Sequence, residues 1–152
     1  MIDRRTFLLF SVAGAAHAQL PPNIGEIRKA ALAEAIRNTT GGAPIRAGRV
    51  KLDLPPLIDN GNVVPLSVEV ESPMTATDHV KAIHVFTERN PQPYVVSAHL
   101  GPRAGRARLA TRVRIADTGV VTAIAQMSDG SFWSGSVSVV VTLSACLEDG
   151  LI

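Results

Sequence analysis

The stretch that decides the fold reads ARLATRVRI and spans residues 107–115. Mostly apolar side chains at its odd positions alternate with three arginines and an alanine at its even positions. A period of two places these two sets on opposite faces of an extended chain, so the stretch predicts a half-buried β-strand. The same alternation covers residues 50–54 and 64–71, where one face is again aliphatic. The chain therefore predicts sheets that each bury one face.

Seven such runs follow one another along the chain, with turn-forming residues between them. The predicted strands are residues 48–54, 64–71, 80–87, 94–100, 107–115, 120–127 and 133–143. Residues 80–87 are apolar on both faces, as in a central strand. No helical segment joins consecutive runs, as a parallel sheet would require. Short strands at this spacing predict an all-β fold, an immunoglobulin-like sandwich.

One helix is predicted before the sandwich, over residues 23–38. Its apolar side chains recur at steps that place them on one face, at Ile24, Ile27, Ala31, Ala35 and Ile36. Asn23 can cap the first turn, and Gly41-Gly42 can end the helix. A single amphipathic helix must cover something, either the sheet or the surface of a partner.

The first 18 residues predict a cleaved export signal that precedes the fold. Arg4-Arg5 stand before an apolar run at 7–16 and a small-residue site, Ala16-His17-Ala18. The apolar run is about half of the roughly 20 residues that cross a bilayer, so no membrane anchor is expected. We expect cleavage before Gln19 and export, already folded, to the periplasm by the twin-arginine route. Residues 19–152 then form one domain.

Charge and composition limit the partners of this domain. Removing Asp3, Arg4 and Arg5 changes the count from 15 basic and 13 acidic residues to 13 and 12. A nearly neutral body argues against nucleic acid or an anionic membrane as the main partner. Aromatic residues make up 4% of the chain, so its core must consist of Val, Ile, Leu and Ala.

The sequence offers little catalytic chemistry, and no enzyme activity or cofactor is expected. It has no glycine-rich phosphate loop, no Gly-x-Ser-x-Gly elbow and no Cys-x-x-Cys pair. His79, His84 and His99 fall in or beside separate predicted strands, so they could bind a metal only if the fold brought them together. The arginines at 103, 106, 108, 112 and 114 predict a solvated face, or alternatively a docking surface for an acidic partner.

Cys146 is the one cysteine of the chain and follows the valine-rich run at 139–141. An unpaired cysteine in an exported protein suggests a reactive thiol or an intermolecular bond. The alternative is a small buried hydrophobic residue at the end of a strand. The thiolate is the reactive form, and Glu148 and Asp149 disfavour it, so a partner would have to activate this thiol.

Several motifs follow the twin-arginine signal and the helix in a fixed order along the chain. They are IDNGNVVP at 58–65, ESPM at 71–74, VKAIHVF at 80–86, NPQP at 90–93, TRVRI at 111–115 and AQMSDGS at 125–131. Together and in this order they resemble the SoxY family of periplasmic thiosulfate-oxidation carriers. The resemblance implies a heterodimer with a second sandwich subunit, SoxZ. It also implies that Cys146, on a carrier tail at 144–152, binds sulfur intermediates covalently. The implied partner enzymes are a haem-containing SoxXA-type protein and a SoxB-type hydrolase.

The segment around Cys146 departs from the family pattern. The family ends in Gly-Gly-Cys-Gly-Gly, whereas this chain has Ser144-Ala145 before the cysteine and Leu147-Glu148 after it. Three hypotheses follow. The chain carries sulfur on Cys146, or it is a non-carrying structural or regulatory paralogue that binds a SoxZ-like partner. The third is a carrier of other cargo, such as copper bound through Cys146 and Met127.

Overall fold

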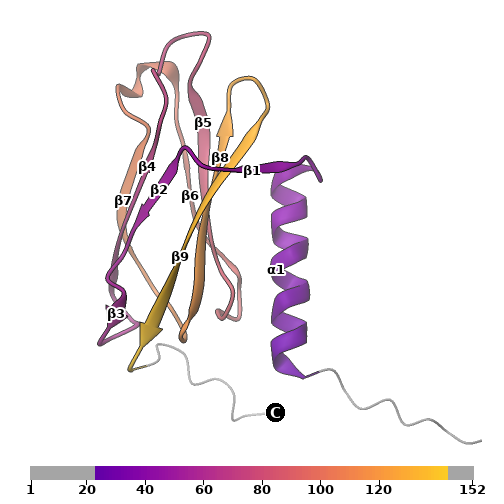
Figure 1. Cartoon of the computed structure of the whole chain (residues 1–152), viewed down its shortest axis with the longest axis vertical. Coiled ribbons are helices and arrows are strands. Elements are labelled where there is room, and N and C mark those ends of the chain that lie inside the picture. The colour runs from indigo at the N-terminus through magenta and orange to yellow at the C-terminus, as the bar shows by residue number, and fades with distance from the viewer. Residues whose placement is uncertain (1–22, 144–152) are drawn as a thin grey trace, which may run out of the picture.

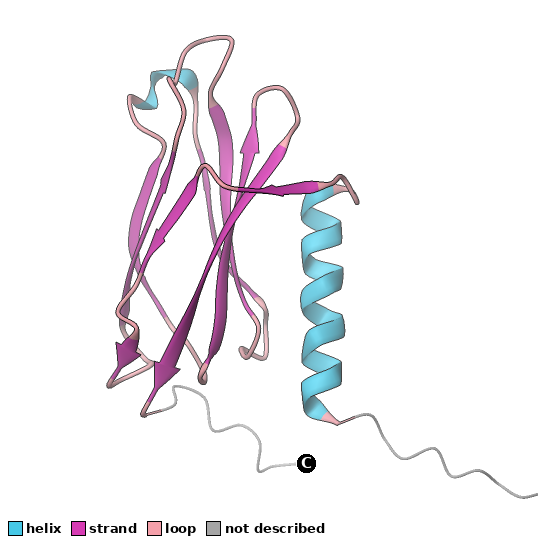
Figure 2. Ribbon diagram, in the orientation of Figure 1, coloured by secondary structure: helices cyan, strands magenta, loops and turns pink. Residues whose placement is uncertain are grey.

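The computed structural model describes residues 23–143, within which one helix precedes nine strands and one short 3₁₀ turn (Figures 1 and 2). The elements are α1 (Ile24–Thr40), β1 (Ile45–Ala47), β2 (Val50–Asp53), β3 (Leu57–Ile58), β4 (Val64–Val70), β5 (Val80–Thr87), β6 (Tyr94–His99), η1 (Pro102–Ala104), β7 (Arg108–Val113), β8 (Gly119–Met127) and β9 (Phe132–Val141). All seven predicted strands are present. The predicted signal at 1–18 and carrier tail at 144–152 lie outside the described residues.

The strands form two sheets that pack face to face as a sandwich. The larger sheet has the order β1-β9-β8-β5-β6, with β3 also paired to β9, and the smaller has the order β2-β4-β7. The long strands pair in antiparallel fashion, β5 with both β6 and β8, and β8 with β9. The predicted all-β, immunoglobulin-like architecture with one N-terminal helix is confirmed.

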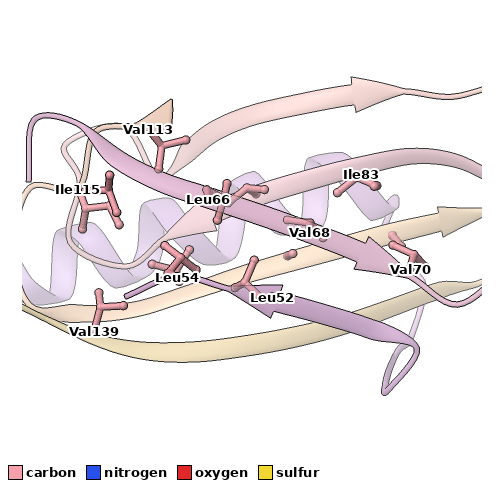
Figure 3. Packing of buried hydrophobic residues seen from close by; sticks show 14 of the residues in the cluster. Leu52, Leu54, Leu66, Val68, Val70, Ile83, Val113, Ile115 and Val139 are labelled. Atoms are coloured by element: carbon pink, nitrogen blue, oxygen red, sulfur yellow. The ribbon is translucent and has the colours of Figure 1, made fainter. Parts of the chain in front are cut away.

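The core between the sheets is built almost entirely from aliphatic side chains (Figure 3). In β4 the buried residues are Val64, Leu66, Val68 and Val70, which alternate with more exposed ones as a period of two requires. Ile83 of β5 faces them from the other sheet (Figure 3). A chain poor in aromatic residues thus packs its interior with branched aliphatic side chains, as its composition predicts.

The helix α1 begins and ends near the predicted residues. The side-chain oxygen of Asn23 accepts a hydrogen bond of 2.9 Å from the N–H of Glu26, as an N-cap does. At the other end Gly41 has a φ of 63°, the left-handed conformation that ends helices. No helix among residues 23–143 has the length and hydropathy needed to cross a membrane.

The C-terminal half of α1 packs its apolar side chains on the sandwich. Leu32, Ala35 and Ile36 contact a small cluster on the outer face of the larger sheet, made by Phe86, Ile124 and Phe132. This contact explains why β5 is apolar on both faces, since one face lines the core and the other lies under the helix. Ile24 and Ile27 are 51% and 52% exposed. The predicted apolar stripe is therefore covered along only part of its length.

Two short strands, β1 and β3, were not predicted, and both pair in parallel with β9. They have three and two residues, too few for a period of two to be recognised. After β1 the chain crosses to the smaller sheet through Gly48 and Arg49, whose φ angles are 111° and 58°. The guanidinium groups of Arg46 and Arg49 lie 5.5 and 4.8 Å from the ring centre of Trp133. These cation–π contacts hold the crossing against β9.

Candidate functional site at the end of strand β9

Cys146, the predicted sulfur-binding residue, lies outside the described residues, so the structure places only the base of its segment. The last described residue is Leu143, three positions before the cysteine. It follows the C-terminal end of β9, which lies beside β3 at one end of the sandwich (Figure 1). The residues around this end therefore surround the point where the cysteine-bearing segment begins.

The loop after β3 holds this base with backbone and side-chain hydrogen bonds. The N–H of Gly61 donates to the carbonyl of Leu143 at 2.9 Å, and the N–H of Thr142 donates to that of Ile58 at 2.9 Å. The hydroxyl of Thr142 also donates to the carbonyl of Asp59 at 3.1 Å. Each bond anchors a residue beyond the end of β9, so the chain has a fixed path as far as Leu143.

A second set of bonds ties the same loop and strand into the body of the sandwich. The carbonyl of Gly61 accepts from the N–H of Ile115 at 2.8 Å, which links the loop to the segment after β7. The hydroxyl of Thr118 accepts from the N–H of Val141 at 2.9 Å. Any reach of the Cys146 thiol must therefore come from residues 144 onward.

Four exposed apolar side chains lie on the segments that form or bind this base. Leu57, Val63, Val140 and Leu143 are between 51% and 59% exposed, and we call them the tail-base patch. Leu57 and Val140 are direct neighbours in the pairing of β3 with β9. Val63 lies two residues after Gly61, whose N–H binds the carbonyl of Leu143. A hydrophobic surface thus borders the point where the cysteine segment begins.

These four residues were not predicted from the sequence, although one signal was present. The outward positions of β9 carry serine at 134, 136 and 138, and then Val140 breaks the row. Leu57 and Val63 gave no comparable signal. The parallel pairing of β3 places Leu57 beside Val140, and the backbone bond from Gly61 to Leu143 places the loop that contains Val63 beside the end of the chain's fixed path.

An open groove with a volume of about 920 Å³ lies across the outer side of the smaller sheet. Its charged side chains are Asp53 and Arg112, and Pro55-Pro56 form part of its wall. Pro56 directly precedes Leu57, so one end of the groove borders the tail-base patch. The described residues that line the groove include no histidine and no group of metal ligands.

The fold brings together two of the three candidate histidines. The rings of His84 and His99 lie with their centres 6.1 Å apart, and His84 Nδ1 is 2.9 Å from the hydroxyl of Tyr94. His79 instead contacts the carbonyl of Thr75 at 3.1 Å. Burial, assisted by the charge of the neighbouring His99, lowers the pKa of His84 below its ordinary value of 6.5. Within residues 23–143 no group of three metal-ligating side chains occurs.

The arginine stretch runs from the turn before β7 to the residue after it. All five of its arginines are exposed, and β7 includes two of them, Arg108 and Arg112, on its outer side. Arg108 stands opposite Glu69 of β4, and its Nε donates to the hydroxyl of Ser67 at 3.4 Å. Exposure is expected for a solvated face and for a docking surface alike, so both interpretations stay predictions.

The hypothesis of a copper site shared by Cys146 and Met127 is not supported by the fold. Met127 is 1% exposed and belongs to the core between the sheets. It follows Gln126, which pairs with Phe132 at the beginning of β9. The cysteine segment leaves the opposite end of that strand, so the thioether lies far from the base of the tail.

Comparisons with known proteins agree on the family. Residues 36–146 match the family model of the sulfur oxidation protein SoxY. Among solved structures, the sulfur carrier protein SoxY from Chlorobium limicola f thiosulfatophilum is similar with a TM-score of 0.63 and 26% identity, over 76% of this chain and 99% of that one. No curated protein matches the chain.

Superoxide reductases share the fold alone. The neelaredoxin of Ignicoccus hospitalis has a TM-score of 0.56 at 15% identity, over 62% of this chain and 80% of that one. A superoxide reductase homologue from Thermotoga maritima has a TM-score of 0.52 at 19% identity, over 63% of this chain and 86% of that one. At such identities the likeness says nothing about activity.

The family match and the similarity to a solved sulfur carrier protein together place the chain in the class of sulfur-oxidation carrier proteins. The chain belongs to the SoxY family. The matched region extends to Cys146, so it includes the base of the tail and the cysteine itself.

Proposed function

We propose that the chain carries sulfur intermediates on Cys146 during thiosulfate oxidation, as one subunit of a heterodimer with a SoxZ-like protein. The observation that carries the proposal is the family match, which extends to the single cysteine of the chain. The fixed base at Leu143 and the cysteine three residues beyond it add support, because they suit a thiol presented on a short segment. In this role the chain is a substrate carrier and not an enzyme.

The proposed loading step forms a disulfide-type bond between the sulfur of Cys146 and the outer sulfur of thiosulfate. The thiol loses its proton, and the two electrons released would leave one at a time through the haem of a SoxXA-type partner to an electron acceptor beyond it. A SoxB-type hydrolase then adds water across the terminal sulfur–sulfonate bond. This step releases sulfate and leaves a persulfide on Cys146. The carrier supplies the nucleophile and its position, and the partners supply the redox and hydrolytic chemistry.

The proposed SoxZ-like subunit requires a surface on this chain, and the N-terminal half of α1 offers one. Ile24 and Ile27 are more than half exposed, whereas Ala35 and Ile36 of the same stripe pack on the sandwich. Covering both side chains would remove apolar surface from water. This burial stabilises a complex by about 25 cal/mol for each Å² covered. Co-expression of the two subunits followed by size-exclusion chromatography tests this pairing.

The proposed location is the periplasm, reached by the twin-arginine route. Arg4-Arg5 and the small-residue site at 16–18 support this proposal. Changing both arginines to lysine should leave an uncleaved precursor in the cytoplasm. Fractionation followed by N-terminal sequencing of the mature chain measures both the route and the cleavage site.

Intact-mass spectrometry of the protein purified from its own host, grown on thiosulfate, tests the carrier function. We expect added masses of sulfur or thiosulfate that a reductant removes, and no such additions in the Cys146→Ser variant. An unmodified thiol under active thiosulfate oxidation would contradict the proposal.

The second candidate function is a non-carrying subunit that still binds a SoxZ-like partner. The residues around Cys146 favour it, because Ser144-Ala145 and Leu147-Glu148 replace the glycines of the family pattern. Side chains restrict the backbone and widen the segment, and both effects hinder entry into a narrow channel. Co-purification with the partner and an unmodified thiol would together identify this function.

A further inference from the structure

The tail-base patch is an unusual feature of the described surface. Within residues 23–143, eight large hydrophobic side chains are markedly exposed, and half of them belong to this patch. Single exposed hydrophobic residues are ordinary, whereas a cluster of them marks a surface that another molecule covers. Its position at the start of the cysteine segment suggests which molecule that is.

The length of chain between the patch and the thiol limits where a reaction can occur. The hydrogen bond from Gly61 fixes the carbonyl of Leu143, and Cys146 comes three residues later. Fully extended chain spans about 3.3–3.6 Å per residue, so the Cα atoms of Leu143 and Cys146 are at most about 11 Å apart. Any enzyme that reacts with the thiol must bring its active site within this distance of Leu143, plus the length of the cysteine side chain and its bound sulfur.

We infer that the tail-base patch is the docking surface for the rim of each active site that receives Cys146, and that this rim is apolar. The inference rests on the proposed carrier function. A folded enzyme cannot approach within about 11 Å of Leu143 without covering the side chains around it. Leu57 and Val140 are adjacent on the outer side of β3 and β9. Their contact with water is then replaced by contact with the partner. A polar rim would lose hydration there without gaining hydrogen bonds from aliphatic side chains.

The same geometry predicts that successive enzymes share one surface. The segment beyond Leu143 is too short to bring the thiol to a partner docked at the start of β9, because a ten-residue strand is about 33 Å long. Each enzyme of the sequence must therefore contact the tail-base patch in its turn. The carrier accordingly visits them one at a time.

The test compares a patch variant with a control of similar chemistry at the other end of β9. The patch variant is Leu57→Ser with Val140→Ser, and the control is Ile45→Ser, a 36% exposed residue that pairs with Phe132. The full chain, in its heterodimer, is loaded with thiosulfate by the SoxXA-type enzyme of the same host. We expect the KM for the carrier to rise about tenfold or more in the patch variant, with little change in kcat. The control should match the wild type.

Two further measurements distinguish a docking enzyme from other molecules or segments that could cover the patch. Iodoacetamide should alkylate Cys146 at the same rate in the wild type and the patch variant without any enzyme. Faster alkylation in the patch variant would show that the chain's own residues 147–152 cover the patch, and would overturn the inference. Loss of the SoxZ-like subunit on sizing would overturn it as well, by assigning the patch to the heterodimer.

The outcomes also distinguish this inference from the proposed function. A patch variant that loads with wild-type KM overturns the docking surface and leaves the carrier function intact. A wild-type chain that accepts no sulfur overturns both.

Discussion

At Gly135 in β9 the backbone of β2 passes so close that no side chain fits. A Cβ at this position would overlap the carbonyl oxygen of Val50. Gly135→Ala should push β2 away from β9 and lower the free energy of unfolding by about 2–3 kcal/mol. Urea denaturation measures the loss. Gly101→Ala is the matched control, because its φ is −121° and no atom lies within 4 Å of the point where an added Cβ would stand. Equal losses in both variants would contradict the steric explanation.

His84 makes the stability of the fold depend on pH. Its pKa in the folded chain is lowered from 6.5, first by burial and second by the charge of His99. The unfolded chain therefore takes up the proton more readily, and acid favours unfolding. The stabilisation from neutral His84 is complete above about pH 6.5 and declines as the pH falls below that value.

Urea denaturation at about pH 7.5 and about pH 5 measures this effect. The free energy of unfolding should be higher at the upper pH, and the difference should be smaller in His84→Gln. Because Gln does not titrate, a variant with the full wild-type difference would show that other groups cause the pH dependence.

At the scale of elements, side chains from neighbouring segments hold the end of β9. The hydroxyl of Thr118 accepts from the N–H of Val141, and replacing it with the isosteric Val leaves that donor without its partner. Thr118→Val should lower the free energy of unfolding by about 1–2 kcal/mol and speed hydrogen exchange at Val141. Thr122→Val, which removes an exposed contact to Ser136, should have a much smaller effect. Unchanged exchange at Val141 would contradict this role.

The long elements could be predicted from sequence because each contains its own periodic signal. Residues 64–70 alternate in burial as their hydrophobicity alternates, and Asn23 caps the helix as its position implies. β1 and β3 contain no such signal, since they form only because β9 offers its edge. The coverage of α1 was also unpredictable from its own stripe. It depends on the positions of Phe86 in β5 and Phe132 in β9, on the outer face of the larger sheet.

For the whole molecule, β9 is the strand to which the other parts are attached. It pairs with β8 along most of its length, with β1 at its start and with β3 at its end. Trp133, near its start, also packs beneath two arginines. The sandwich thus acts as a rigid mount for the segment that follows. Sequence predicted Cys146 as the site, whereas the tail-base patch depends on the pairing of Leu57 with Val140, which are 83 positions apart.

The last prediction concerns residues 144–152, which follow the end of β9. Replacing residues 144–148 by Gly-Gly-Cys-Gly-Gly and ending the chain there should speed thiosulfate loading of the cysteine. Glycine frees the backbone, and the change removes the side-chain charges of Glu148 and Asp149 while placing one carboxylate, the new C-terminus, at position 148. The negative charges near the cysteine therefore fall from two to one. At an effective dielectric near 20, a like charge about 7 Å from the anionic cargo costs on the order of 2 kcal/mol before salt screening. If this cost is felt in the transition state, the rate should rise about tenfold or more.

Stopped-flow or quenched loading assays with the SoxXA-type enzyme of the host measure this rate at low and high salt. Because salt screens the charge, the advantage of the glycine-rich segment should shrink as ionic strength rises. Changing only Glu148 and Asp149 to Gln and Asn separates charge from backbone freedom. Cys146→Ser should abolish loading in every background. A glycine-rich segment that loads no faster would mean that the native residues already fit their own partner enzymes, and that Leu147 and Glu148 contribute to that fit.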